Sequence, residues 1–155
     1  MRDIRILLHN IRSVYNVGAI FRTADAIGVS KVYLSGYTPG PLDRFGRVRK
    51  DFAKCALGSE TSVPSEHVDC MKTIKVLSKE GFQVVVLEQA DTSIDYKKVK
   101  IGQKTLVICG NEVSGVEKKV VRNADIVAEI PMRGNKESLN VSVSAGIALF
   151  RWFDR

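Results

Sequence analysis

The run Thr105-Leu106-Val107-Ile108-Cys109 is followed at once by Gly110-Asn111-Glu112-Val113-Ser114-Gly115. The first part has no polar alternation, which is typical of a strand covered on both faces in a parallel sheet. The second part sets polar side chains between two glycines at the carboxyl end of that strand. Open α/β sheets bind ligands at this edge, so we expect a binding loop here, with a plain strand-to-helix turn as the alternative. The loop matches neither glycine-rich pattern that binds dinucleotides or ATP phosphates.

Strands and helices alternate along the rest of the chain. Further apolar runs predict strands at residues 4–8, 31–35, 84–87 and 126–130. Apolar spacing and capping residues predict helices near residues 17–27, 51–56, 117–122 and 141–153, and one between Asp69 and Gly81. Gly28 is expected to end the first helix, and Asp69 is expected to cap the helix that Gly81 stops. This order favours one α/β domain over residues 1–155, with a mostly parallel sheet and helices against it.

The composition limits the class of protein. The 155 residues are 45% hydrophobic and 26% charged, which is ordinary for a globular domain and excludes collagen, coiled coil and intrinsic disorder. No apolar run approaches the ~20 residues of a membrane span. The cysteines are widely spaced without a CxxC, so we expect free thiols and no metal site. Asp3 and His9 interrupt any signal-peptide core, and we expect a cytoplasmic protein.

The first predicted helix carries Asn16 and Arg22. Arg22 lies about 140° around the helix from Val17, so it points away from the apolar stripe. A solvated arginine paired with Asp25 is the alternative to a functional role. Gly18 in the same helix costs about 1 kcal/mol relative to alanine, which indicates a close approach of a backbone or a ligand.

The last predicted helix follows a polar loop, Ile130-Pro131-Met132-Arg133-Gly134 to Ser138-Leu139-Asn140. Ser138 is a candidate cap for this helix. Apolar side chains occur on one face, at Val141, Ala145, Leu149 and Trp152, and on another, at Val143, Ile147 and Phe150. A helix that is apolar nearly all round needs cover on every side. We infer a partner subunit, with full burial inside one subunit as the alternative.

A basic loop, Asp43 to Lys54, lies between the first and the last predicted helix, and in it positive charges alternate with aromatic residues. The whole chain has 24 Lys and Arg against 17 Asp and Glu, a net charge of +7. Arg44, Arg47, Arg49 and Lys50 surround Phe45, and Tyr37 precedes them. Such a loop suits a phosphate backbone and stacked bases, although an ordinary solvated loop has the same composition. Our candidate RNA-binding residues are Arg12, Arg44, Arg47, Arg49 and Lys50. His9 and His67 lie in no recognisable nucleophile setting, so no hydrolase triad is indicated.

Three segments together resemble the SpoU/TrmH family of RNA ribose 2′-O-methyltransferases, in the SPOUT class. They are Asn16–Val29, Leu106–Gly115 and Ile130–Gly146, in the family's order and spacing. The resemblance implies a parallel sheet with helices on both faces, a deep trefoil knot near the C-terminus, and a homodimer whose sites use both subunits. It also implies S-adenosylmethionine as the methyl donor and tRNA or rRNA as the acceptor.

The resemblance also assigns residues. By position, the cofactor contacts match Gly110, Ile130, Met132 and Leu139, with Leu87 as a further candidate. The catalytic positions match Asn16, Arg22, Glu112, Ser138 and Asn140. Arg22 is better suited to hold a phosphate or a developing alkoxide than to act as a base, because a guanidinium group stays protonated in proteins. The competing interpretations are an RNA-binding protein of the same fold without catalytic activity and a methyltransferase that acts on a base nitrogen.

Overall fold

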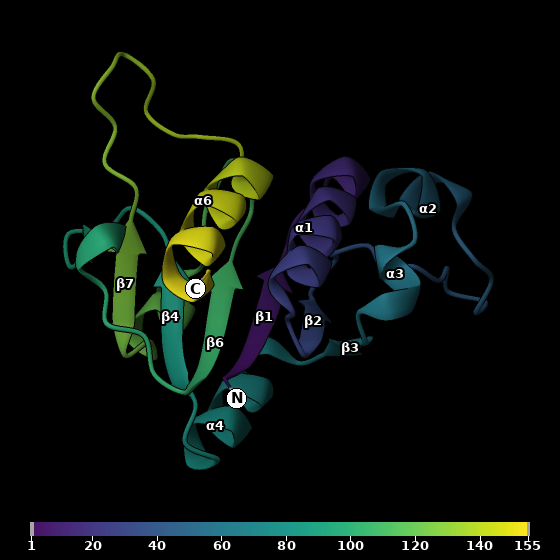
Figure 1. The fold of residues 1–155 in the computed structure, drawn as a ribbon, viewed down its shortest axis with the longest axis horizontal. Helices are drawn as coiled ribbons and strands as arrows, with labels where there is room; N and C mark the ends of the chain where they lie inside the picture. Colours follow the sequence, from purple (N-terminus) through teal and green to yellow (C-terminus); the bar gives the residue numbers. More distant parts are fainter. Residues whose placement is uncertain (1, 155) are drawn as a thin grey trace.

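Within residues 2–154, which the computed structural model describes, seven parallel strands form one sheet in the order β3-β2-β1-β6-β4-β7-β5 (Figure 1). The strands are β1 Asp3–His9, β2 Lys31–Ser35, β3 Ser65–Val68, β4 Gln83–Leu87, β5 Ile94–Asp95, β6 Lys104–Cys109 and β7 Ile126–Glu129. All the predicted strands are confirmed. The sequence did not indicate β3 and β5, because these short edge strands are largely exposed and lack an apolar run.

The centre of the sheet is the most apolar part of the core. Ile6 of β1 pairs with Val107 of β6, and Val107 pairs with Val85 of β4. All three side chains are fully buried. A strand covered on both faces cannot alternate apolar and polar residues, which is why these runs were recognisable in the sequence.

Helices cover both faces of the sheet. They are α1 Val14–Ile27, α2 Lys50–Ala56, α3 Ser59–Ser62, α4 Cys70–Lys79, α5 Lys118–Arg122 and α6 Val141–Phe153, with a 3-10 turn at Tyr96–Lys98. Side chains of α1, α2 and α6 join one core cluster with Ile6, Val85 and Val107. Side chains of α4 and α5 join the other with Val84 and Ile108. The predicted α/β class is therefore confirmed.

The helix ends follow local signals, with one difference. Gly28 ends α1 at φ 79°, and the Asp69 side chain caps α4 by accepting from the backbone N–H of Lys72. At α6 the cap is Asn140, whose Oδ1 accepts from the N–H groups of Ser142 and Val143. The expectation that Ser138 caps this helix is therefore wrong, because the first turn begins two residues later.

Gly18 marks the close approach that its position predicted. A Cβ at Gly18 would lie 2.5 Å from the Cβ of Cys55 and 3.1 Å from the backbone N of Ala56. Helix α1 therefore packs directly on α2, and any side chain at this position would separate the two.

The carboxyl ends of the strands define the functional edge. Strand β2 lies on one side of β1, whereas β6, β4 and β7 lie on its other side. The loops after β1 and β6 therefore leave neighbouring strands in different directions, the arrangement that creates a crevice in open α/β sheets. In Figure 1 the long loop between β7 and α6 projects from this edge. None of the helices in residues 2–154 has the length and apolarity that crossing a membrane requires.

Candidate functional site

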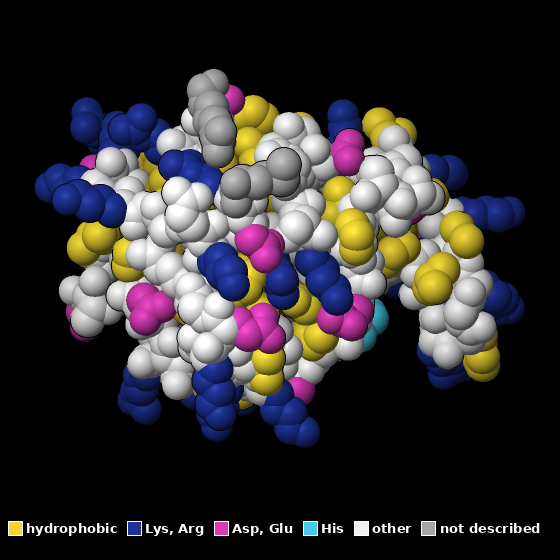
Figure 2. Space-filling view, turned by 60° about the horizontal axis from the view of Figure 1, so that its bottom comes forward, with side chains coloured by type: hydrophobic (Ala, Val, Ile, Leu, Met, Phe, Trp, Pro, Cys, Tyr) yellow, Lys and Arg dark blue, Asp and Glu magenta, His cyan; other side chains and the backbone are white. Residues whose placement is uncertain are grey.

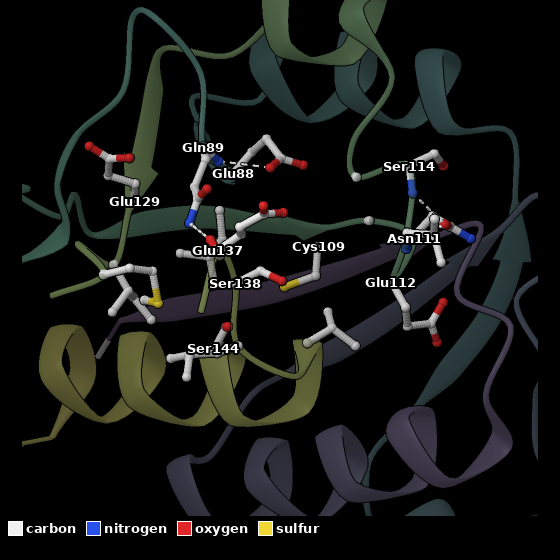
Figure 3. Close-up of a pocket in the computed structure, with 18 residues that line it drawn as sticks. Glu88, Gln89, Cys109, Asn111, Glu112, Ser114, Glu129, Glu137, Ser138 and Ser144 are labelled. Carbon is white, nitrogen blue, oxygen red and sulfur yellow. Dashed lines mark hydrogen bonds between the residues drawn. The ribbon is translucent and has the colours of Figure 1, made fainter. Parts of the chain in front are cut away.

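A cavity of about 320 Å³ lies at the carboxyl ends of β4, β6 and β7. Side chains from the loops after these strands and from the start of α6 point into it (Figure 3). Five of the lining residues are the predicted cofactor contacts, namely Leu87, Gly110, Ile130, Met132 and Leu139. The structure thus brings together residues that the resemblance assigned from three separate segments. The predicted residues Glu112 and Ser138 line the same cavity.

The loop after β6 is held by its own hydrogen bonds. The Oδ1 atom of the buried Asn111 accepts from the N–H groups of Val113 and Ser114, both at 2.8 Å. The backbones of Asn111 and Gly115 exchange two further bonds, of 3.1 and 3.0 Å. Gly115 adopts φ 70°, a conformation that favours glycine. A Cβ at Gly110 would lie 2.6 Å from Val116 Cγ2, so close packing requires a glycine at position 110 as well.

Glu88 fixes this loop from the side of β4. Its carboxylate accepts from the N–H groups of Gln89 and Val116, each at 2.7 Å. Gln89 in turn donates from Nε2 to the carbonyl of Glu137 at 2.8 Å (Figure 3). This is the link between the loop after β4 and the loop after β7.

A polar network joins the three segments that carried the resemblance. Glu112 Oε1 accepts from the Asn16 side chain at 3.1 Å, and the Asn16 Oδ1 accepts from the Asn140 side chain at 3.0 Å. The Glu112 carboxylate also accepts from the N–H groups of Arg12 and Ser13, both at 3.1 Å. One carboxylate therefore fixes the start of α1 and, through Asn16, the cap of α6.

The surroundings of Glu112 favour its charged form. Partial burial opposes ionisation, but the hydrogen bonds from the backbone N–H groups of Arg12, Ser13 and Glu112 itself, together with the Asn16 amide, outweigh it and lower the pKa of this carboxyl. Glu112 is thus an acceptor at neutral pH, suited to orient the donors around it.

Other chemical groups near the site have no nucleophilic role. Burial raises the pKa of the Cys109 thiol to about 12, so it stays protonated at neutral pH. His9 bonds to Ser35 through Nδ1 and to Glu117 through Nε2, both at 2.7 Å. Although these are the residue types of a hydrolase triad, Ser35 is only 1% exposed. Its hydroxyl cannot reach a substrate, and the group instead ties β1 and β2 to the start of α5.

Three of the predicted catalytic residues are exposed. Ser138 and Asn140 are exposed in the loop after β7. Arg22 is exposed on α1 and does not line the cavity. It is six residues beyond Asn16, about 9 Å along the helix axis. Within residues 2–154 it has no ion pair with Asp25, whose carboxylate accepts from the Ser62 hydroxyl instead.

The basic loop lies at the other end of the sheet from the loop after β7 (Figure 1). Arg47 pairs with Asp43 at 2.8 Å and Arg49 with Asp51 at 2.7 Å. The guanidinium groups of Arg44 and Arg47 lie 4.7 and 5.0 Å from the centre of the Phe45 ring. Figure 2 shows basic and hydrophobic side chains together on this projecting part. Arg12 is exposed beside Glu112, apart from this loop.

The predicted binding loop after β6 also contributes Asn111, Val113, Ser114 and Gly115 to the lining. Sequence reasoning missed the other lining residues, which are Glu88, Gln89, Cys109, Glu129, Glu137, Val141 and Ser144. Glu88 and Gln89 directly follow β4, and Glu129 ends β7, so the rule that ligands lie at the carboxyl ends of parallel strands could have found them. Glu137 carried no such signal, because an irregular loop brings it to the cavity.

Comparisons with known proteins agree with this geometry. The chain is 33% identical over 150 residues to the tRNA (guanosine(18)-2′-O)-methyltransferase of Aquifex aeolicus, an alignment covering 96% of this chain and 68% of the relative. It spans between 57% and 73% of the length of the curated relatives it matches. The AdoMet-bound rRNA methyltransferase of Sinorhizobium meliloti matches with a TM-score of 0.88 at 29% identity, over 97% of this chain and 56% of that one.

A second solved structure, the A. aeolicus TrmH/SpoU tRNA modifying enzyme, matches with a TM-score of 0.84 at 30% identity, over 97% of this chain and 74% of that one. The sequence model of the SpoU rRNA Methylase family matches residues 3–150. The match spans every strand and all three segments that meet at the cavity, and the chain belongs to the SpoU rRNA methylase family.

Proposed function

We propose that this protein transfers a methyl group from S-adenosyl-L-methionine to a ribose 2′-hydroxyl of tRNA or rRNA. The observation that carries the proposal is the cavity after β4, β6 and β7, because it joins the predicted cofactor contacts to the network of Glu112, Asn16 and Asn140. Membership of the SpoU family supports it, as do the printed names of the A. aeolicus and S. meliloti relatives.

The residues around the cavity fit this methyl donor. Its lining combines apolar side chains, among them Leu87, Met132 and Leu139, with the carboxylates of Glu88, Glu129 and Glu137. Apolar side chains suit the faces of an adenine ring, and carboxylates suit an ammonium group and a positively charged sulfur. When bound, S-adenosyl-L-methionine supplies a methyl group already activated by the charge on its sulfur.

The task of the chain is to align the ribose oxygen with that methyl group. Alignment of reacting groups can lower a barrier by ~7–11 kcal/mol. Asn16, Asn140 and Ser138 present amide and hydroxyl groups beside the cavity, where they can hold a ribose or the cofactor carboxylate. Glu112 orients Asn16 through the 3.1 Å bond, and Asn16 in turn receives the bond from Asn140.

We further propose a homodimer in which Arg22 of the partner subunit completes the site. Arg22 is exposed and outside the cavity of its own subunit. On α6, Val143, Ile147 and Phe150 remain 49%, 37% and 45% exposed, so one apolar face of this helix is uncovered. A second copy on this face would remove apolar surface from water and bring another α1 near the cavity. Arg22 would then bind an RNA phosphate or stabilise the developing alkoxide.

A trefoil knot near the C-terminus would require the segment that contains α6 to pass through an earlier loop of the chain. The chain from β4 through β5 to β6 forms a long loop beside β7. The Trp152 side chain of α6 donates to the carbonyl of Tyr96, in the middle of that loop, at 2.8 Å. We propose that the C-terminal segment passes through this loop as a trefoil knot, as the resemblance implies. Tracing the chain in an experimental electron-density map would decide it.

The proposed RNA contacts are Arg12, Arg44, Arg47, Arg49 and Lys50. Arg12 flanks Glu112, whereas the others extend the surface toward the far end of the sheet. Their positive charge suits phosphates at both places. An enzyme acting on tRNA or rRNA would work in the cytoplasm, which is where we propose this one is found.

The test is methyl transfer from labelled S-adenosyl-L-methionine to total tRNA and rRNA, followed by nuclease mapping. We expect label on one ribose, lost when the 2′-hydroxyl of the target is replaced by hydrogen. Label retained after that replacement would identify a base-nitrogen methyltransferase. Binding of RNA without binding of S-adenosyl-L-methionine in calorimetry would identify a silent RNA-binding protein.

Arg22→Ala tests the shared site. We expect the variant to lose turnover and to keep its affinity for S-adenosyl-L-methionine, because the groups proposed to contact Arg22 are an RNA phosphate and the developing alkoxide and not the methyl donor. Arg22→Lys keeps the charge without the planar fork and should retain little activity. Turnover of the alanine variant at the wild-type rate would contradict the proposed role.

A further inference from the structure

Tyr37 is an exposed aromatic residue on a rigid backbone. Gly36 before it adopts φ 62°, and a side chain there would overlap the Asn10 amide. Thr38 after it is 1% exposed. Its hydroxyl lies 3.0 Å from the carbonyl oxygen of Leu8 and accepts from the N–H of Ile11 at 3.1 Å. The backbone on both sides of Tyr37 is therefore fixed against the ends of β1 and β2.

The side chain of Tyr37 is fixed as well. Its hydroxyl accepts from Nδ2 of Asn111 at 2.9 Å, and the same Nδ2 donates to the carbonyl of Asn10 at 2.9 Å. Asn111 is the residue before Glu112, and it holds the loop after β6. The tyrosine ring is thus attached to the loop that carries Glu112, although 58% of the residue remains exposed.

Tyr37 and Phe45, in the same connection between β2 and α2, differ in what covers their rings. Phe45 is contacted by the guanidinium groups of Arg44 and Arg47. Within residues 2–154, the Tyr37 ring has no aromatic or cation–π partner. A rigid ring with an uncovered face loses little conformational entropy when a flat group stacks on it.

The segments that adjoin Tyr37 along the chain carry positive charge. Arg12 is two residues beyond Asn10, whose carbonyl accepts from the same Asn111 amide as Tyr37, and Arg44 is seven residues beyond Tyr37. Single-stranded RNA presents phosphates to such cations and unstacked bases to aromatic rings. Val113, which is 92% exposed on the same loop as Glu112, adds apolar surface beside Asn111.

We propose that Tyr37 stacks on an unpaired base of the bound RNA, next to the nucleotide whose ribose enters the site. This assignment rests on the proposed function. It gives the enzyme a contact that recognises an unpaired, splayed-out base without reading its hydrogen-bonding edge. The target would accordingly lie in a loop or at an end of the RNA rather than inside a helix.

The test compares Tyr37→Ala, Tyr37→Leu and Tyr37→Phe in affinity for bulk tRNA and bulk rRNA, measured over 50–200 mM salt. Loss of one stacked base should weaken binding by about 5- to 150-fold in the alanine and leucine variants. The phenylalanine variant should keep most of the affinity, because its ring still stacks. The slope of affinity against salt should be unchanged in all three, whereas Arg44→Ala should lower it by about 1.

Three results would overturn the inference. The first is wild-type RNA affinity in Tyr37→Ala. The second is an equal loss of RNA affinity in Tyr37→Phe and Tyr37→Ala. The third is a variant whose self-association, measured by sedimentation, changes while its RNA affinity does not. The second would assign Tyr37 to holding Asn111, and the third would assign it to a contact between copies. Affinity is measured without turnover, so these results stand even if methyl transfer, the test of the proposed function, is not observed. Calorimetry with S-adenosyl-L-methionine should give the wild-type value for every Tyr37 variant.

Discussion

The loops after β6 and β7 leave the same edge of the sheet and line the same cavity, but they are held in different ways. Residues 110–116 form two backbone bonds with one another, and their N–H groups donate further bonds to the side-chain oxygens of Asn111 and Glu88. Within residues 2–154, no backbone–backbone bond begins from an N–H of residues 131–139. Residues 133–140 are all exposed. The side chain of Gln89 supplies the bond that reaches Glu137.

The difference shows which part of the site is ready before a ligand arrives. A loop whose polar groups are already paired keeps its shape without ligand, so it can fix Glu112 in advance. A loop whose N–H groups face water can form new bonds with a cofactor or a second subunit, and its ordering then depends on them. We therefore expect changes in the loop after β6 to affect folding and changes in the loop after β7 to affect binding.

Glu112→Ala should have the largest effect. The variant removes a charged acceptor from the N–H groups of Arg12 and Ser13 and from Asn16. We expect a loss of about 1.5–3 kcal/mol in the free energy of unfolding, measured with urea. Turnover should fall by at least about 100-fold, because the start of α1 shifts.

Glu137→Ala is the matched control, because it removes a carboxylate from the other loop. Within residues 2–154, Glu137 forms a hydrogen bond only through its backbone carbonyl, which accepts from Gln89. Its free energy of unfolding should stay within about 0.5 kcal/mol of wild type. Equal destabilisation by the two variants would contradict the distinction between the loops.

The same substitution at two glycines gives the next largest contrast. A Cβ at Gly110 would lie 2.6 Å from Val116 Cγ2 and 2.8 Å from the carbonyl carbon of Gly115, whereas a Cβ at Gly134 would meet nothing within 4 Å. Gly110→Ala should therefore lower the free energy of unfolding by about 1–3 kcal/mol. Gly134→Ala should leave it unchanged or raise it by up to about 1 kcal/mol. Thermal unfolding of both variants measures this, and similar values would remove the contrast.

Hydrogen exchange with and without S-adenosyl-L-methionine sharpens the comparison further. Amides that are already bonded in residues 110–116 have little protection to gain. Within residues 2–154, no hydrogen bond begins from a backbone N–H of residues 133–139, so these amides should gain the larger protection on binding. The readout is peptide mass spectrometry at a saturating donor concentration. Greater protection of residues 110–116 would show that the loop after β6 is the one that orders.

The smallest expected effect is the pH dependence of the stability that the Glu112 carboxylate contributes. Its folded-state pKa lies below the ordinary value of 4.5, so its charge contributes stability that is present above pH 4.5 and is lost as the pH falls through the folded-state pKa. The stability difference between wild type and Glu112→Gln should therefore be constant from pH 7 to about 5 and shrink below pH 4.5. A difference that stays constant at lower pH would show that the charge of Glu112 is not responsible.

Much of the fold and some of the site followed from short-range patterns. The buried strands were predicted because continuous β-branched and apolar runs have few other uses in a domain of this size. Gly28 and Asp69 ended or began helices as expected, because a left-handed residue and a capping carboxylate act within one turn. The loop that begins at Gly110 was predicted from its place at the end of a buried strand, whereas the cavity contacts at Ile130, Met132 and Leu139 were available only through the resemblance, because no local pattern distinguishes them from an ordinary turn.

The sequence by itself determined the central strands, the longer helices and the segments that carry the chemistry, but not β3, β5 or α3. Only the tertiary structure decided that Glu112 meets Asn16, 96 residues away along the chain, and that Asn140 reaches Asn16 across 124 residues. It also decided that Arg22 lies outside its own cavity and that Gln89 reaches Glu137. The physical reason is the distance along the chain over which each kind of interaction acts. Backbone preference and side-chain periodicity act over a few residues, whereas the order of parallel strands determines which distant loops leave the same edge together.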